Sequence, residues 1–216
     1  MNQQNEYPIV IGIIGGVASG KSTLTELLQK RGAKVLLADV IAHGVLKEPG
    51  VIQQLRELFG DGIFSDAGSA NGPAIDRKKL AALVFGSSGE PTNRRKQLEA
   101  IVHPRIREIA KLQLQSLRLE PGLKYIVLDA PLLIEGGWLP YCNKVVFVET
   151  SAELRESWAA SRGWSRNEWQ LRESAQLSLE EKRSHATDVL VNLGNMAALE
   201  LEVTKMLQRW TDVGRS

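Results

Sequence analysis

The chain has 216 residues, of which 43% are hydrophobic and 24% charged, and its 27 basic and 25 acidic side chains leave a net charge of only +2. These values are ordinary for a soluble globular protein with one compact domain and one or two excursions, and they give no indication of a nucleic-acid partner. The single cysteine, Cys142, excludes an intrachain disulfide and a four-cysteine metal site. Because the N-terminal residues are polar and Asp129 interrupts the longest apolar run, we expect a cytoplasmic protein without a membrane partner.

Residues 8–39 predict a βαβ unit. The apolar run PIVIGII at 8–14 is typical of a central parallel strand that is covered on both faces. A glycine loop follows, and then leucines at helical spacing between residues 20 and 31, with Gly32 at the position of a helix-stopping glycine. KVLLAD at 34–39 predicts the second strand, joined to the first by a right-handed crossover.

Residues 40–119 have the pattern of a helical insertion. Helices are expected at 49–60, at 76–85 and within a long stretch from 90 to 119. Asp76 is expected to cap the second of these, and Pro104 to lie in the first turn of a helix that begins after His103. The small, polar, glycine-rich segment 65–74 predicts a mobile surface loop.

Three further strands are predicted in the second half of the chain, at 124–131, 143–150 and 186–192, before a final helix at 196–210. With the first two strands they make an α/β fold with a five-stranded parallel sheet between two helical layers. Residues 151–183 are helical in pattern, heavily charged and rich in tryptophan, which is the composition of a partly exposed arm.

The segment from Gly15 to Ser22 matches the P-loop pattern G-x-x-x-x-G-K-[ST] between a predicted strand and a predicted helix. Glycines let main-chain N–H groups wrap closely around a triphosphate, while Lys21 reaches its β- and γ-phosphates and the Ser22 hydroxyl can ligate Mg²⁺. The GxGxxG fingerprint of dinucleotide-binding proteins is absent. The pattern predicts a nucleotide-binding loop made of Gly15, Gly16, Val17, Ala18, Ser19, Gly20, Lys21, Ser22 and Thr23.

Two aspartates follow predicted strands at the sheet edge where the P-loop also lies. Asp39 either accepts a proton from an acceptor hydroxyl that attacks the γ-phosphorus, or caps the helix that follows. Asp129 either holds Mg²⁺, directly or through water, or only ends its strand. Glu135 lies in the loop after the same strand and can face the same cleft.

Other candidate site residues come from the arm and the insertion. Arg155 and Arg162 are seven residues apart, so a helix would place both on one face. They would either close over the phosphates and exclude water, or belong to a solvated face shared with glutamates. His103 has no metal-ligand spacing with the other histidines, so we expect it to cap the helix at Pro104 or to touch a substrate.

From about Ile9 to Trp210 the sequence resembles the dephospho-coenzyme A kinase family. The resemblance rests on GIIGGVASGKST at 12–23, ADVIAHGVLKEPG at 38–50, LFG at 58–60, IDRKKLAALVF at 75–85, LEAIVHPRI at 98–106, PLLIE at 131–135 and VLVNLG at 189–194. The elements AD-x-IA, HP-x-I and PLL-x-E, in this order, are much more particular to this family than the P-loop is.

The resemblance implies ATP-dependent phosphorylation of the ribose 3′-hydroxyl of dephospho-coenzyme A, with ATP and Mg²⁺, on a P-loop kinase fold. It implies a nucleotide-binding core at 7–39, 120–150 and 184–212, a helical acceptor domain at 40–119 and a lid at 151–183. Asp39 becomes the expected base, and Lys21 the second catalytic residue. The ATP site gains Arg155 and Arg162, the metal site is expected at Ser22 and Asp129, and the acceptor site at Asp39, Arg77, His103, Leu133 and Glu135.

The sequence departs from the family pattern at a few positions. Leu37 replaces an aspartate, Ala18 a glycine and His43 an arginine, and none of these changes removes required chemistry. The family's lid arginines are four residues apart, but Trp158 stands four residues before Arg162. Arg155 is therefore expected to substitute from the same face.

Two other functions are compatible with a P-loop. A GTP-dependent switch would need a guanine-reading Asn-Lys-x-Asp motif, and NKVV at 143–146 lacks its aspartate. A kinase for another small acceptor, such as a nucleoside, stays open because residues 40–119 do not spell out an acceptor pocket. The expected partners are small molecules, ATP and dephospho-coenzyme A, and the expected state is a monomer or a weak homo-oligomer.

Overall fold

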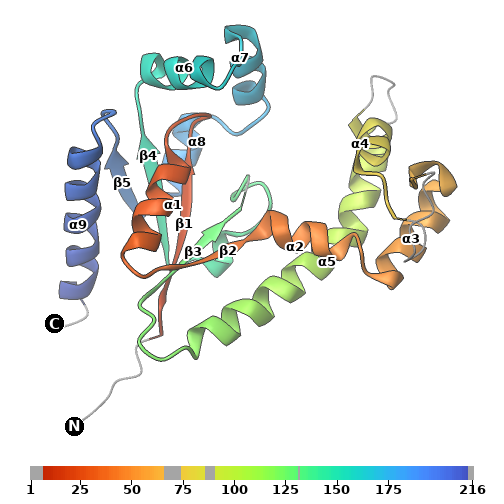
Figure 1. Cartoon of the computed structure of the whole chain (residues 1–216), viewed down its shortest axis with the longest axis horizontal. Coiled ribbons are helices and arrows are strands. Elements are labelled where there is room, and N and C mark those ends of the chain that lie inside the picture. The colour runs from red at the N-terminus through yellow and green to blue at the C-terminus, as the bar shows by residue number, and fades with distance from the viewer. Residues whose placement is uncertain (1–6, 66–73, 86–90, 131, 214–216) are drawn as a thin grey trace. The chain divides into compact units, whose positions relative to one another are not determined.

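The computed structural model describes residues 7–65, 74–85, 91–130 and 132–213 (Figure 1). The chain divides into two compact units. The first comprises the residues up to Leu37 together with those from Ser116 onward, and the second comprises Ala38–Gln115. No helix in the described part of the chain is both long and apolar enough to cross a membrane.

The first unit is built on a parallel sheet of five strands. The strands are β1 (Ile9–Gly15), β2 (Lys34–Leu37), β3 (Tyr125–Asp129), β4 (Lys144–Glu149) and β5 (Asp188–Val191). Their order across the sheet is β2-β3-β1-β4-β5. The five predicted strands and the α/β class are thus confirmed.

The predicted second strand was two residues too long. β2 ends at Leu37, and the helix α2 (Ala38–Val45) begins directly after it, so Asp39 lies in the first turn of a helix and not at the end of a strand. The last residue of β2, Leu37, is exposed, whereas Ala38, Ile41 and Val45 are buried at helical spacing. The helical period therefore outweighs the strand pattern from Ala38 onward.

The strand register brings the carboxyl ends of the strands to one edge of the sheet. Gly15 of β1 pairs with Val148 of β4, and Leu37 of β2 pairs with Asp129 of β3. In an open parallel sheet this edge is where ligands bind. The P-loop, Asp129 and the residues that follow β4 and β5 are therefore neighbours at the same edge.

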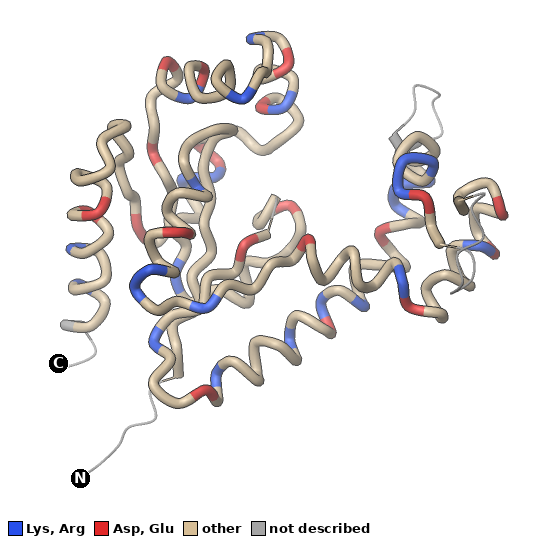
Figure 2. Tube along the Cα trace, viewed as in Figure 1, with Lys and Arg blue, Asp and Glu red and all other residues tan. Residues whose placement is uncertain are grey.

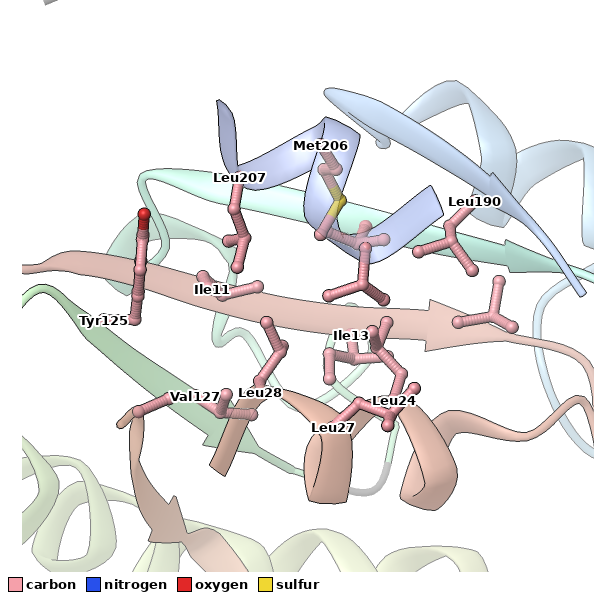
Figure 3. Close-up of a cluster of buried hydrophobic side chains, with 14 of the residues drawn as sticks. Ile11, Ile13, Leu24, Leu27, Leu28, Tyr125, Val127, Leu190, Met206 and Leu207 are labelled. Carbon is pink, nitrogen blue, oxygen red and sulfur yellow. The ribbon is translucent and has the colours of Figure 1, made fainter. Parts of the chain in front are cut away.

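One part of the core lies between the sheet and two helices, α1 (Lys21–Lys30) and α9 (Met196–Val213). Figure 3 shows leucines of α1 and residues of α9 converging on Ile11 and Ile13 of β1. Each helix contributes apolar residues three or four positions apart, which is why these two segments are helices with one buried face. The helix residues in this cluster are Leu24, Leu27, Leu28, Leu199, Val203, Met206, Leu207 and Trp210.

The opposite face of β1 is covered by the segment that follows β3 and by α8 (Leu179–Ser184), which lies behind the sheet in Figure 1 and contacts β1. A Cβ atom at Gly12 would lie 2.8 Å from the sulfur of Cys142 and 2.9 Å from Cδ1 of Leu133. The absence of a side chain at Gly12 thus lets Cys142 and Leu133 pack directly on the strand. Burial raises the pKa of the Cys142 thiol to about 12.

We expect Cys142 to be nearly inert toward thiol reagents in the folded protein. At pH 8 a pKa of about 12 leaves roughly a thousandth of the thiolate of an ordinary cysteine with a pKa near 9, and the thiolate is the reactive form. Labelling with 5,5′-dithiobis(2-nitrobenzoate) should therefore be about 10³-fold slower in native protein than in protein unfolded by guanidinium. Native labelling within tenfold of the unfolded rate would contradict this burial.

Residues 151–184 form three short helices, α6 (Ala152–Ser161), α7 (Arg166–Ser174) and α8. Each begins at a serine whose side chain accepts a hydrogen bond from the main-chain N–H three residues later: Ser151 from Leu154, Ser165 from Glu168 and Ser178 from Glu181. Such caps satisfy orphan N–H groups at a helix start, which helps short helices to persist in a heavily charged segment. The helical character predicted for this arm is confirmed.

The second unit is helical in its described residues. It contains α2, α3 (Pro49–Phe59), a short turn of 3-10 helix at Asp61–Ile63, α4 (Arg77–Phe85) and most of α5 (Pro91–Arg118). Figure 2 marks the first turn of α4 as basic, where Arg77, Lys78 and Lys79 follow one another. Asp76 caps this helix as predicted, because its carboxylate accepts hydrogen bonds from the N–H groups of Lys78 and Lys79.

Two expectations for this unit need comment. Pro104 lies inside α5 and does not begin a helix, so His103 cannot be its cap. Proline removes one main-chain hydrogen bond, but apolar residues at helical spacing on both sides, including Val102, Ile106 and Ala110, are buried and carry the helix through. Most of the loop expected at 65–74 lies outside the described residues; Phe64 and Ile75 on either side form an antiparallel bridge.

Candidate active site

The P-loop connects the end of β1 at Gly15 to the start of α1 at Lys21. The helix begins at Gly20, which has a φ of 90° and provides no side-chain cap. The first N–H groups of α1 are therefore available to an anion, which the helix dipole also favours. Ala18 has a φ of 63°, a left-handed conformation that glycine adopts freely and alanine rarely adopts.

Side chains from three other elements hold the loop in shape. The carbonyl of Ser19 accepts hydrogen bonds from the Thr150 hydroxyl at 2.9 Å and from the Asn192 amide at 3.1 Å. The indole N–H of Trp169 in α7 donates to the carbonyl of Val17 at 3.4 Å. Thr150 and Asn192 directly follow β4 and β5, so the sheet edge itself supports the loop.

Lys21 folds over the start of the loop. Its ammonium donates to the carbonyl of Gly16 at 2.7 Å and to that of Gly15 at 3.3 Å. Burial, and then the positive charge of Lys182, lower the pKa of Lys21 to about 8. Both of these acceptors are neutral, so a phosphate group would offer this ammonium an anionic partner.

Asp129 and Ser22 are the residues expected to hold Mg²⁺. Asp129 ends β3 and is half-buried, and its negative charge acts on Lys21 to favour the protonated form. Ser22 is the second residue of α1 and is exposed. A carboxylate and a hydroxyl are oxygen donors of the kind that Mg²⁺ prefers when phosphate oxygens complete its shell. Among the described residues no three His, Cys, Asp or Glu side chains cluster as a protein-only metal site.

The two predicted lid arginines differ sharply in their surroundings. Arg155 of α6 is buried, pairs with Glu173 of α7, and donates to the carbonyl of Thr150 at 3.3 Å. Its guanidinium lies so close to Gly16 that a Cβ there would collide with it. Arg162 ends α6 and is exposed. The fold thus brings Arg155 to the P-loop, whereas Arg162 is exposed to solvent.

Two predicted acceptor residues lie in the segment that follows β3. Leu133 is buried and packs against Gly12, as described above. Glu135 is exposed, and its carboxylate accepts a hydrogen bond from the N–H of Leu177 at 3.0 Å, just before α8. Glu135 thus ties this segment to the end of the arm.

The other three predicted residues belong to the second unit. Asp39 is exposed in the first turn of α2, and Arg77 is exposed as the first residue of α4. His103 is half-buried in the middle of α5, where burial lowers the pKa of its imidazole.

Comparison with known proteins decides the family. The sequence model of the dephospho-CoA kinase family matches residues 9–198 of this chain. The chain belongs to the dephospho-CoA kinase family. Membership makes the protein an ATP-using kinase of the coenzyme A pathway, and the P-loop is the part of the fold that such a kinase requires.

Relatives and solved structures agree along nearly the whole chain. The dephospho-CoA kinase of Rhodopirellula baltica is 36% identical over 92% of this chain and 91% of its own length, and that of Bacillus licheniformis 35% identical over 95% and 98%. A solved structure from Thermus thermophilus, 36% identical, covers 94% of this chain and 98% of its own with a TM-score of 0.74. The dephospho-CoA kinase of Campylobacter jejuni, 27% identical, covers 93% and 96% with a TM-score of 0.61. The P-loop kinase fold is confirmed.

Several residues around the P-loop of this member of the dephospho-CoA kinase family were not predicted from the sequence. Thr150 and Asn192 are polar residues that directly follow apolar strands, and this signal could have found them. Trp169, Glu173 and Lys182 lie in a charged helical segment whose pattern resembles a solvated surface. Only the folded chain reveals that these three approach the loop.

We expect Gly20→Ala to lower both the free energy of unfolding and the affinity for ATP. A Cβ there would lie 2.5 Å from the Asn192 amide nitrogen, which holds the Ser19 carbonyl, and the φ of 90° is already unfavourable for alanine. Gly32→Ala is the matched control, because Gly32 has a φ of 87° and nothing within 4 Å of an added Cβ. The control should cost about 1–2 kcal/mol.

Gly20→Ala should cost about 1 kcal/mol more than Gly32→Ala, the contribution of a typical hydrogen bond. Denaturant unfolding and calorimetric titration with ATP measure the two effects. A Gly20→Ala variant as stable as the control would show that Asn192 does not support the loop.

Proposed function

We propose that this protein transfers the γ-phosphoryl group of ATP to the ribose 3′-hydroxyl of dephospho-coenzyme A. The match of residues 9–198 to the family is the observation that carries this proposal. The geometry of the P-loop supports the nucleotide half of the reaction, because Lys21 lies at the carbonyls of Gly15 and Gly16 beside an uncapped helix start. Three further expectations stay predictions: that the partners are small molecules only, that the protein is cytoplasmic, and that it is a monomer or a weak homo-oligomer.

Binding of the triphosphate is assigned to the P-loop. The N–H groups between Gly15 and Thr23 surround the phosphate oxygens, and Lys21 exchanges its two carbonyl partners for the β- and γ-phosphates. Positive charge placed next to the transferring phosphoryl group stabilises the transition state, in which negative charge is spread over the phosphoryl oxygens. Arg155 is close enough to Gly16 to add to this charge if it leaves Glu173, and Arg162 stays a predicted contact.

Ser22 and Asp129 are the residues that would hold Mg²⁺. The cation, when bound with ATP, would neutralise charge on the β- and γ-phosphates. The role of this chain is to supply the hydroxyl and the carboxylate from two elements that meet at the sheet edge.

Asp39 is the proposed general base. The 3′-hydroxyl oxygen forms a bond to the γ-phosphorus while the bond from that phosphorus to the bridging oxygen breaks, and ADP leaves. The hydroxyl proton passes to the Asp39 carboxylate. Support comes from the position of Asp39 two residues after β2 and from the family pattern at 38–50.

The two other segments are assigned by their position in the chain. We assign residues 40–119 to acceptor binding, with Arg77 and His103 as contacts, and 151–183 to a lid. Leu133 and Glu135 complete the proposed acceptor set, with Leu133 acting through packing. The separation of Ala38–Gln115 as a compact unit supports an independent acceptor-binding part.

An assay that couples ADP release to a spectroscopic signal tests this function. The purified protein is given ATP, Mg²⁺ and either dephospho-coenzyme A or one of several nucleosides and nucleoside monophosphates. We expect turnover with dephospho-coenzyme A alone. Turnover with a nucleoside instead would identify a P-loop kinase for a different acceptor.

The same assay without acceptor tests the alternative of a nucleotide switch. A kinase that positions its acceptor should release almost no phosphate from ATP alone, because water lacks the binding contacts that place the acceptor oxygen. Steady hydrolysis of nucleotide in the absence of any acceptor would favour the switch.

A further inference from the structure

Lys182 is a buried lysine that none of the proposed roles uses. It lies in α8, and only 5% of its surface is exposed. Its ammonium donates to the side-chain oxygen of Gln176 at 2.6 Å and to the carbonyl of Gly15 at 3.4 Å. Residues 167 positions apart in the sequence thus meet at the start of the P-loop.

Two ammonium groups share the Gly15 carbonyl. Lys21 donates to it at 3.3 Å from within the P-loop, and Lys182 donates to it from α8. The acceptors of both groups are neutral oxygen atoms, from Gly15, Gly16 and Gln176. Within the described part of the chain, the site therefore holds two like charges close together whose hydrogen bonds all go to neutral acceptors.

Three carboxylates and one further cation also act on the two ammonium groups. Arg155, Glu173 and Asp129 act on Lys21, while Glu135, Glu173 and Arg155 act on Lys182. Glu173 is bonded to Arg155, and Glu135 to the main chain at Leu177. Burial is the main cause that lowers the pKa of Lys182.

A buried ammonium with neutral partners is costly, and an anion that accepts its hydrogen bonds repays that cost. An ammonium has three N–H donors, and two of those on Lys182 bond to residues that the structure describes. The third remains for a further acceptor. The anion that a P-loop is built to hold is the phosphate chain of a nucleotide, and it would lie against the same Gly15 backbone.

We propose that Lys182 is a second phosphate-binding lysine, which contacts the ATP phosphates together with Lys21. The inference rests on the proposed function only in taking a nucleoside triphosphate as the ligand of the P-loop. It adds a residue of the arm to the nucleotide site. The arm would then contribute a positive charge to this site in addition to its proposed role as a lid.

Calorimetric titration of the full-length protein with ATP and with ADP, without acceptor, tests this role. We expect Lys182→Met to weaken ATP binding about 10–100-fold, the range given by hydrogen bonds to charged groups. A larger loss for ATP than for ADP would place the ammonium at the γ-phosphate, and equal losses would place it at the β-phosphate. Both results support the proposal.

Gln176→Met is the matched control. It removes the nearest partner of Lys182 and keeps the charge, so ATP affinity should stay within twofold of the wild type or increase. If Lys182 serves only to fasten α8 to the loop, Lys182→Met should weaken ATP binding and also lower the melting temperature, because it removes the bond to the Gly15 carbonyl. That combined result would overturn the proposal. Because an apolar side chain avoids the cost of burying a charge, we expect Lys182→Met to melt no lower than the wild type.

ATP affinity within twofold of the wild type in Lys182→Met, or equal losses in the two variants, would overturn the proposal. Should Lys182→Met fail to fold, Lys182→Gln takes its place, because its shorter side chain keeps a polar end and removes the charge. Failure of both to fold would make Lys182 a structural residue and overturn the proposal too. Wild-type protein that binds ATP but does not phosphorylate dephospho-coenzyme A would refute the proposed acceptor and leave this test intact.

Discussion

Replacing Lys21 with methionine is expected to lower kcat/KM by about 10²–10³-fold in the coupled assay with dephospho-coenzyme A, the usual effect of removing one group that stabilises transition-state charge. Methionine keeps the length and apolar stem of the side chain and removes only the ammonium. The ammonium lies 2.7 Å from the Gly16 carbonyl, inside the loop that would hold the phosphates. Lys21 is the only basic residue between Gly15 and Thr23, so no other residue of the loop can replace its charge.

The control for this variant is Lys30→Met, a change of the same kind at an exposed position in the last turn of the same helix. It should leave kcat/KM within twofold of the wild type. Circular dichroism and melting temperature verify that both variants are folded. A Lys21→Met protein with more than a third of wild-type kcat/KM would remove Lys21 from the mechanism.

Asp39→Asn is expected to lower kcat by about 10²–10⁴-fold, the range for loss of a general base, with little change in ATP affinity. Asparagine has nearly the same shape and retains a side-chain oxygen for the start of α2, but it cannot take the acceptor proton at neutral pH. Steady-state kinetics give kcat, and titration with ATP gives the affinity separately.

Asp61→Asn is the matched control in the same compact unit. Asp61 is an exposed aspartate that pairs with Arg56 at 3.0 Å on the surface, where such a pair contributes little to stability. Its replacement should not change turnover. If Asp39→Asn instead retains near-normal turnover and only lowers the melting temperature, Asp39 serves its helix through the dipole and not the reaction.

Local patterns in the sequence predicted most elements of the first unit. Short apolar runs indicated the five strands, because a strand buried on both faces needs apolar residues without interruption. The glycines and Lys21 indicated the P-loop in the same way, since the loop is made from consecutive residues. The errors lie at element ends: Asp39 belongs to a helix, and Pro104 lies within one.

The environment of the site could not be predicted in this way. Arg155 was expected to face the phosphates, and the structure pairs it with Glu173 on the next helix. Lys182 lies in SLEEKRS, a stretch that reads as a solvated helix, yet it is among the most buried charged side chains of the described chain. Whether a charged residue is solvated or buried depends on which other segments pack over it. The residues next to it in the sequence do not indicate which segments these are.

By itself, therefore, the sequence determined the class of fold, the phosphate-binding loop and, through its ordered motifs, the kinase family, because each of these depends on residues that are close together in the chain. The tertiary structure alone decided the strand order and which distant side chains support the loop. Thr150 and Asn192 reach the Ser19 carbonyl across 131 and 173 residues of chain, and Lys182 reaches Gly15 across 167. The first two contacts form because a parallel sheet brings the ends of separate strands to one edge, and the third forms because α8 packs against β1. Both arrangements are properties of the folded molecule.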